Sequence, residues 1–182
     1  PEDMQKVFKL ISDSVKQNKD LKGKSYENTA YISDTYGPRL WGHKPLELAL
    51  NHIKRMMEKD GFDNVRLEEI KDVPVWTRGN EYLILKSPRK VPFKIPMIGL
   101  GLSIGGDFKD TEVIVVQNFK ELEDLDESKV KDKIVLMNGK WEKNYGDTVK
   151  YRVLTAIKAG EKGAKAAIIR SIAPKSLETP HT

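Results

Sequence analysis

The sequence has 182 residues, of which 38% are hydrophobic and 32% are charged, a composition typical of a globular protein that builds a core. Cysteine is absent, which excludes a disulfide framework and a thiolate metal site. The net charge is +5, but basic and acidic residues are interleaved and no apolar run approaches the roughly 20 residues of a membrane span, so we expect neither a nucleic-acid nor a membrane partner.

The first part of the chain is predicted to be helical. Apolar residues recur at spacings of three and four from Glu2 to Gln17, which indicates an amphipathic helix. Ser25 is placed to cap a second helix that runs through Asp34 and ends at Gly37-Pro38, because glycine closes a helix easily and proline cannot continue it.

A third helix is predicted between Pro45 and Gly61, since proline suits a first helical turn and glycine suits a helix end. Its apolar stripe consists of Leu46, Leu50, Ile53 and Met57. The stripes of the first and third helices need a partner surface, because contiguous apolar faces of this size are rarely exposed in a monomer.

From Asn64 the pattern changes to β-like runs. Strands are predicted at Val65 to Leu67, Glu81 to Lys86, Ile95 to Leu100, Glu112 to Gln117, Lys133 to Asn138 and Ala164 to Arg170. A helix from Thr148 to Glu161 precedes the last of these. The composition changes near Lys71 to Pro74, which separates a helical segment, residues 1–71, from an α/β module, residues 72–182.

Gly101 to Gly105 matches G-x-S-x-G, the nucleophile elbow of serine hydrolases. An elbow needs a strand before it and a helix directly after it, whereas Gly106 to Asp110 leads into another predicted strand. The base of a triad would have to be His181, beside the end of the sequence. We therefore interpret this motif as a glycine-rich turn that joins two strands, and we keep catalysis by Ser103 as an alternative.

His43, His52 and His181 are the complete set of histidines, and none of them begins an H-E-x-x-H or H-x-D pair. We therefore assign no catalytic residue and no metal ligand to this segment. His52 is interpreted as a half-exposed residue of the third helix.

The loop from Gly37 to His43 presents an arginine, an indole and an imidazole between two predicted helices. Arg39, Trp41 and His43 are our candidates for contact with a substrate cleft, because loops held by flanking helices often carry function. The planar guanidinium of Arg39 suits a carboxylate, either that of a peptide terminus or a structural aspartate. A packed interhelix turn is the alternative.

Several motifs in a fixed order resemble the plasma glutamate carboxypeptidase family, also called carboxypeptidase Q. The resemblance runs from about Tyr26 to Thr182. It is carried by SDTYGPRLWG, VPVWTRGNE, IGLGLSIGG, KDKIVLMN, NYGDTVKYR, IIRSIAP and the terminal TPHT.

The resemblance implies a secreted or lysosomal metallopeptidase that binds a pair of zinc ions in an α/β domain and hydrolyses short peptides. Residues up to about Lys71 would be the leading helices and first strand of the peptidase domain. Residues from Asp72 onward would be a β-rich protease-associated insertion. The metal site would be supplied by sequence beyond Thr182, which makes the remainder of the polypeptide an expected partner. The resemblance also implies a peptide substrate and a second copy in a homodimer.

Three functions follow as alternatives. In the first, the chain is part of a zinc-dependent carboxypeptidase or dipeptidase and, by itself, neither binds zinc nor cleaves peptides. In the second, it belongs to a non-catalytic binding or storage protein on the same scaffold, since a fold does not certify an activity. In the third, it is a serine hydrolase that uses Ser103.

Overall fold

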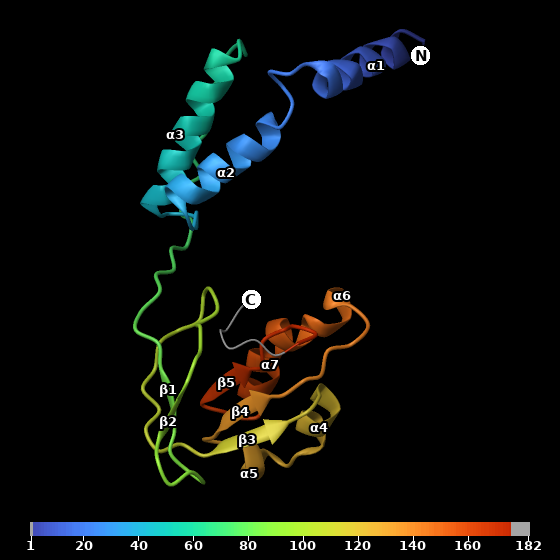
Figure 1. Ribbon diagram of the computed structural model, residues 1–182. Helices are drawn as coiled ribbons and strands as arrows, with labels where there is room; N and C mark the ends of the chain where they lie inside the picture. The colour runs from blue at the N-terminus through green and yellow to red at the C-terminus, as the bar shows by residue number, and fades with distance from the viewer. Residues whose placement is uncertain (1, 176–182) are drawn as a thin grey trace. The chain divides into compact units, whose positions relative to one another are not determined.

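The computed structural model describes residues 2–175, which divide into two compact units at the Trp76–Thr77 bond. The first unit is helical, and the second combines two small sheets with short helices (Figure 1). The mixed α/β class predicted from the sequence is confirmed. Among the described residues, no helix is both long enough and apolar enough to cross a membrane.

The first unit contains three helices, α1 (Glu2–Gln17), α2 (Lys24–Tyr36) and α3 (Lys44–Lys59). All three were predicted. The cap assigned to Ser25 is wrong, because Gly23 occupies the N-cap position and no side chain caps the helix. Gly23 adopts φ 82°, a left-handed conformation that glycine enters without strain, so the chain turns into the helix before it reaches Ser25.

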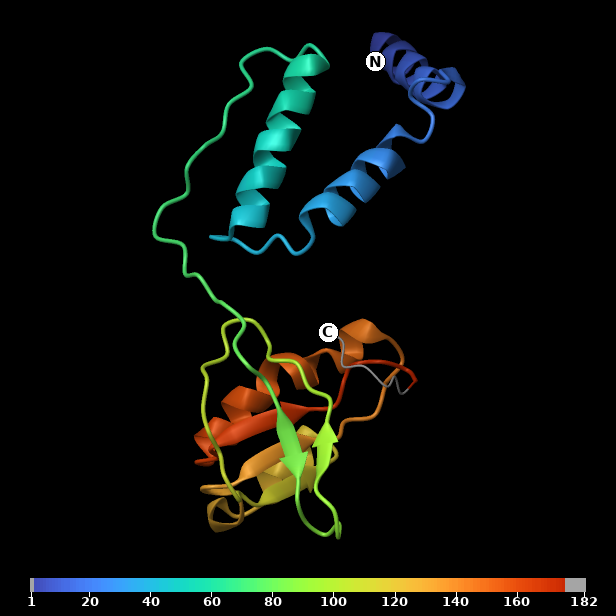
Figure 2. The ribbon, with the colours of Figure 1, turned by 60° about the vertical axis from the view of Figure 1, so that its left-hand side comes forward.

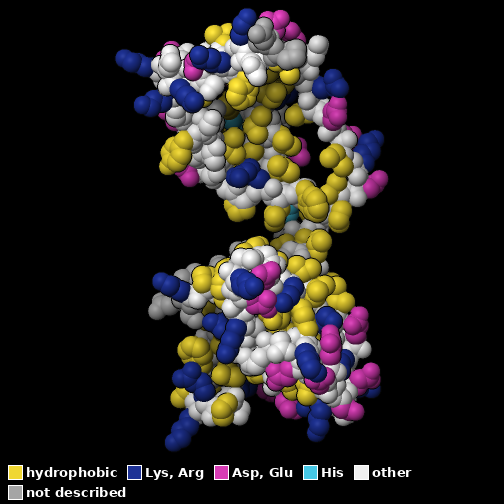
Figure 3. Space-filling view, turned by 90° about the vertical axis from the view of Figure 1, so that its right-hand side faces the viewer, with side chains coloured by type: hydrophobic (Ala, Val, Ile, Leu, Met, Phe, Trp, Pro, Cys, Tyr) yellow, Lys and Arg dark blue, Asp and Glu magenta, His cyan; other side chains and the backbone are white. Residues whose placement is uncertain are grey.

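Very little of the first unit is buried. Among its described residues, Ala49 alone is fully buried, at 1% exposure. The apolar stripe of α1 is open to solvent, with Phe8 75% exposed. The principal contact between α2 and α3 is aromatic: the ring of His52 stacks on Tyr31, with 4.6 Å between centroids. Figure 3 shows hydrophobic side chains gathered on the open face of the helices.

Two predicted strands are wrong, each for a physical reason. No strand forms at Val65 to Leu67, where the chain after α3 runs on without helix or strand (Figure 2). A strand needs a neighbouring backbone to satisfy its amides and carbonyls, and none pairs there among the described residues. The strand expected at Ile95 to Leu100 ends at Ile95, because Pro96 has no N–H to donate.

The second unit contains an antiparallel pair and a parallel sheet. The pair is formed by β1 (Leu83–Leu85) and β2 (Phe93–Ile95). The sheet has the order β3-β4-β5 and consists of β3 (Val113–Val116), β4 (Ile134–Met137) and β5 (Ala166–Ile169). The last three strands lie within their predicted ranges.

The helices of the second unit connect the parallel strands. They are α4 (Phe119–Asp124), α5 (Glu127–Val130), α6 (Tyr145–Thr148) and α7 (Lys150–Glu161). The helix predicted from Thr148 to Glu161 corresponds to α7, and α6 precedes it without having been predicted. The sequence did not predict α4 and α5, because each is too short to show a hydrophobic period. The capping residues Asn118 and Asp126, which accept hydrogen bonds from the first turns, were the available signal.

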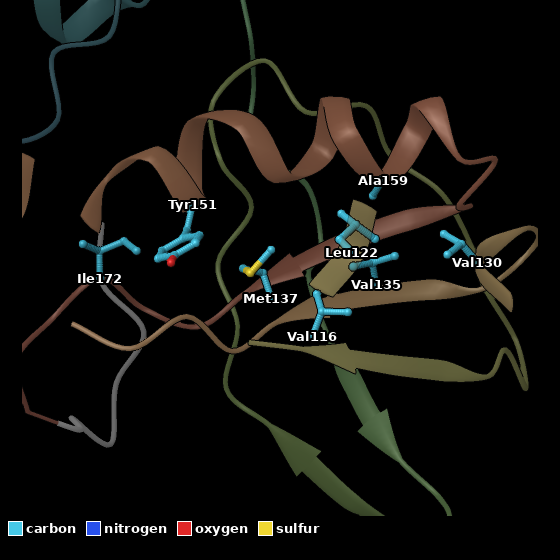
Figure 4. Packing of buried hydrophobic residues seen from close by; sticks show 8 residues of the cluster. All are labelled: Val116, Leu122, Val130, Val135, Met137, Tyr151, Ala159 and Ile172. Carbon is cyan, nitrogen blue, oxygen red and sulfur yellow. The ribbon is translucent and has the colours of Figure 1, made fainter. Parts of the chain in front are cut away.

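The hydrophobic core lies between the parallel sheet and α7, as Figure 4 shows. Tyr151 and Ala159 come from one side of α7 and meet the sheet. The remaining members of the buried cluster are Val116, Leu122, Val130, Val135, Met137 and Ile172. This core holds the ends of the strands and their loops in place.

Candidate functional site

The loop from Gly37 to His43 joins α2 to α3, and Arg39 binds the end of α2. Its Nη1 donates to the carbonyl oxygen of Gly37 at 2.6 Å and to that of Ile32 at 3.4 Å. The last carbonyls of a helix have no partner within the helix, so Arg39 caps α2. Arg39 is nevertheless exposed.

His43 occupies the N-cap position of α3 but does not cap it with its side chain. Instead, its Nε2 lies 2.9 Å from the carbonyl oxygen of Trp76. A carbonyl only accepts hydrogen bonds, so Nε2 carries the proton and donates. The imidazole thereby joins the loop to a segment that lies 33 residues further along the chain.

Gly42 makes a second contact with the same segment. It adopts φ 72°, and a Cβ built on it would lie 2.3 Å from Cγ2 of Val75. A side chain at this position is therefore excluded both by conformation and by space. Gly42 allows the backbone of the loop to approach Val75 closely.

Trp41 differs from the other two candidates, because its indole is 54% exposed. It stands between Leu40, also half-exposed, and Gly42. Arg39 and His43 are therefore hydrogen-bonded to backbone carbonyls, whereas the indole of Trp41 is exposed to solvent.

The serine motif lacks the structure of a nucleophile elbow. Ser103 lies in a turn, where its N–H donates to the carbonyl of Leu100 at 3.1 Å. No helix follows, since the chain continues without regular structure to β3. The strand before it ends at Ile95, eight positions earlier. Ser103 is consequently placed in a glycine-rich connection, and the elbow geometry that would activate it is absent.

His52 is taken up by a packing contact between two helices. It lies on α3, where its ring stacks on Tyr31 and lies near Tyr36, both on α2, which matches its interpretation as a helical residue. His181 and the TPHT motif lie outside the described residues. Within residues 2–175, no group of three or more histidine, cysteine, aspartate or glutamate side chains is arranged to hold a metal ion.

Glu81 holds the glycine-rich connection to the start of the second unit. Its carboxylate accepts a hydrogen bond from the backbone of Gly99 and pairs with Arg78 at 2.7 Å. These two contacts, the Gly99 bond first, lower the pKa of Glu81 below its ordinary value. A Cβ on Gly99 would lie 2.5 Å from Oε1 of Glu81, so a side chain at this position would displace the carboxylate.

A second network closes the loop before α6. The carboxylate of Glu142 accepts from Lys150 Nζ at 2.7 Å and from the hydroxyl of Tyr151 at 3.1 Å. The Lys150 bond lowers the pKa of Glu142, while burial raises the pKa of Tyr151. Gly139 packs against the Tyr151 ring, where a Cβ would be 2.6 Å from the ring edge. This network fixes the loop on the core.

No family model matches the chain, but individual proteins are similar to it. Carboxypeptidase Q of Xenopus laevis is 37% identical over 193 residues, a match that covers 98% of the chain. Carboxypeptidase Q of Homo sapiens is 41% identical over 161 residues, 87% of the chain. The chain is therefore similar in sequence to part of carboxypeptidase Q.

The fold supports the homology. The crystal structure of a Peptidase M28 precursor from Shewanella amazonensis SB2B matches with a TM-score of 0.76 and 26% identity, over 96% of the chain. The chain covers 40% of that protein. It spans 40% of the Xenopus carboxypeptidase Q and 33% of the human one. The resemblance to carboxypeptidase Q drawn from the motifs is confirmed.

Sequence reasoning missed the contacts that the loop from Gly37 to His43 makes with distant residues. It singled out His43 for a cleft, but did not foresee the bond to Trp76 or the close approach of Gly42 to Val75. Gly42 ends one of the motifs that carry the resemblance, and Val75 and Trp76 belong to another. The motifs marked these segments as important, but their spacing in the sequence did not indicate that they are in contact.

Proposed function

We propose that this chain is the N-terminal portion of a secreted or lysosomal zinc metalloexopeptidase that hydrolyses short peptides. Identity of 35–41% to carboxypeptidase Q over most of the chain is the observation that carries the proposal. The structural match to a Peptidase M28 precursor supports it. In this proposal, residues 1–71 belong to the peptidase domain and residues 72–182 form a protease-associated insertion.

The described residues of this chain do not fit a zinc site. The part of the chain that the structure describes offers no cluster of three potential ligands, and structural or catalytic zinc requires at least three protein donors. We therefore assign no catalytic step to these residues. In the proposal, zinc is held by sequence beyond Thr182, and it supplies Lewis-acid chemistry for peptide hydrolysis.

The exposed apolar faces of the first unit support the proposal that the chain is part of a larger protein. The stripe on α1 and the apolar residues of α3 lack a core, since Ala49 alone among the unit's described residues is fully buried. The extended alternation at Val65 to Leu67 lacks a neighbouring strand among the described residues. We propose that the remainder of the polypeptide covers the helices and pairs with this segment as a first strand.

The experiment that tests the function uses the full-length protein and a set of dipeptides with free termini. We expect hydrolysis that a chelator abolishes and that added zinc restores, because the proposed reaction depends on the Lewis-acid chemistry of the metal. Residues 1–182 produced alone are expected to show no chelator-sensitive hydrolysis.

Two results would reject the proposal. Hydrolysis that persists in chelator but is lost in Ser103→Ala would assign the activity to the serine hydrolase alternative. Stoichiometric peptide binding without hydrolysis, in a full-length protein loaded with zinc, would assign the scaffold to a binding or storage protein. Analytical ultracentrifugation of the same sample tests the homodimer.

The loop candidates give a paired prediction in the full-length protein. Trp41→Ala is expected to lower kcat/KM by about tenfold with little change in thermal stability, because an open indole is available to a substrate. Arg39→Ala is expected to lower stability by about 1 kcal/mol with turnover per folded molecule retained, since it removes the cap of α2. Steady-state kinetics and thermal denaturation separate the two effects. The opposite assignment would hold if Arg39→Ala lowered kcat/KM while leaving the melting temperature unchanged.

A further inference from the structure

The pair formed by β1 and β2 carries a cluster of basic side chains at one end. The antiparallel pairing leaves the loop from Lys86 to Pro92 at the end where β1 turns into β2 (Figure 2). Lys86, Arg89 and Lys90 lie in this loop, and Lys94 follows on β2. We call these four residues the basic tip. Short runs rich in lysine and arginine are typical of patches that bind polyanions such as heparin.

The basic tip is open to solvent and has no acidic neighbours along the chain. Every residue from Lys86 to Lys94 is exposed. No aspartate or glutamate occurs between Lys86 and Gly106, which distinguishes this segment from the interleaved charges elsewhere in the sequence. Lys86 pairs with Asp110, but the other three cations of the tip have no ion-pair partner in the part of the chain that the structure describes.

The tip also has a defined shape. The guanidinium carbon of Arg89 lies 4.7 Å from the centroid of the Phe93 ring, a cation–π contact that positions the arginine. Pro88 and Pro92 restrict the backbone of the loop, because the ring of proline fixes φ. The residues from Arg89 to Phe93 line an open hollow of about 350 Å³. This hollow offers room for a compact anionic group beside two cations.

We propose that the basic tip binds a sulfated polysaccharide. Such a polymer carries sulfate and carboxylate groups at short intervals, so a single chain of it can meet several cations of one exposed loop. Arginine presents a planar fork of donors and lysine a compact point charge, and both suit oxyanions. The proposal is independent of the peptidase activity, because no residue of the tip has a role in that function.

Two other kinds of polyanion fit the tip less well. An anionic membrane is held by apolar side chains in addition to cations, and single-stranded nucleic acid by bases that stack on aromatic rings. The aromatic ring of this hairpin end, Phe93, is occupied by Arg89. Val91, which is 73% exposed, then remains as a small apolar anchor. A polysaccharide needs neither an inserted side chain nor a stacking ring.

The test measures the binding of heparin to the full-length protein by isothermal titration calorimetry at several salt concentrations. We expect binding at about 0.15 M salt that weakens as salt is added, because counterions screen exposed charges. The triple variant Arg89→Gln, Lys90→Gln, Lys94→Gln is expected to bind at least about tenfold more weakly. Thermal denaturation is expected to show an unchanged melting temperature, since all three side chains are exposed.

A second triple variant, Lys129→Gln, Lys140→Gln, Lys143→Gln, is the matched control. It removes the same charge from the second unit, and its three lysines are also exposed and lack an ion pair within the described ranges. It is expected to change the affinity for heparin by no more than about twofold. This comparison separates binding at the tip from attraction by the net charge of the protein.

Three results would overturn the proposal. The first is that heparin does not bind to the unaltered full-length protein at about 0.15 M salt. The second is that both triple variants lose affinity equally, which would assign the binding to net charge alone. The third is that the tip variant keeps its affinity for heparin but loses binding to vesicles of phosphatidylserine, which would assign the tip to a membrane surface. Should the tip variant fail to fold, the single variant Lys90→Glu decides between the same outcomes.

Discussion

Residues 77–182, produced alone, are expected to unfold cooperatively, with a free energy of unfolding of about 5 kcal/mol or more. Residues 1–76, produced alone, are expected to show no cooperative transition. The reason is the distribution of buried surface: the buried hydrophobic cluster lies wholly in the second unit, whereas Ala49 is the sole fully buried residue described in the first. Urea titration followed by circular dichroism measures both.

The comparison has a clear contrary outcome. A cooperative, monomeric transition for residues 1–76 would show that the three helices bury their stripes against one another, and the proposed cover by the remainder of the polypeptide would then be unnecessary. Adding residues 77–182 in trans is the control. It is expected to leave the first fragment unfolded, because our proposal assigns the partner of α1 and α3 to the remainder of the polypeptide and not to residues 77–182.

Leu122→Ala is expected to destabilise the second unit by about 2–5 kcal/mol, because it removes a fully buried side chain and leaves a cavity. Leu122 is 0% exposed and lies on α4, where it joins Val116 and Val135 in the core. For a unit of about 100 residues, this loss corresponds to a fall in the melting temperature of at least about 10 °C. Differential scanning calorimetry of residues 77–182 measures it.

Leu102→Ala provides a control with the same change in chemistry. Leu102 is 63% exposed, so its truncation is expected to change stability by no more than about 0.5 kcal/mol. Equal losses for the two variants would mean that α4 does not contribute to the core as described. If the isolated unit proves insoluble, hydrogen exchange of the β4 amides in the full-length protein gives the same comparison.

The sequence determined most of the secondary structure, and the reason is local. Apolar spacing of three and four residues predicted α1 and α3, because this period needs no information about distant residues. The continuous apolar runs VIVV, IVLM and AAII were assigned to strands, and they form the parallel sheet of the second unit. Parallel strands have both faces apolar, which makes such runs recognisable.

The errors arose where a distant partner decides the outcome. Val65 to Leu67 has the alternation of apolar and charged residues that is typical of a strand. A strand also needs a neighbouring backbone to pair with, and no described backbone pairs with this segment. Pro96 ended β2 despite the apolar residues that follow it, since hydrogen bonding overrides hydrophobic pattern at that residue.

For the candidate site, too, the sequence revealed the local features. The sequence identified the loop from Gly37 to His43, because glycine and proline mark a rigid turn between two helices. The resemblance to carboxypeptidase Q was likewise readable from ordered motifs. Composition excluded disulfides and thiolate metal sites without any structure.

Only the tertiary structure decided what the residues of that loop contact. Arg39 turned out to bind the carbonyls that end α2, and His43 turned out to hold the carbonyl of Trp76, 33 residues away. Similarly, the fit of Glu81 against Gly99 depends on a fold that brings two separate segments together. Hydrogen bonds between distant segments leave no periodic trace in a sequence, because their partners are selected by the packing of the whole unit.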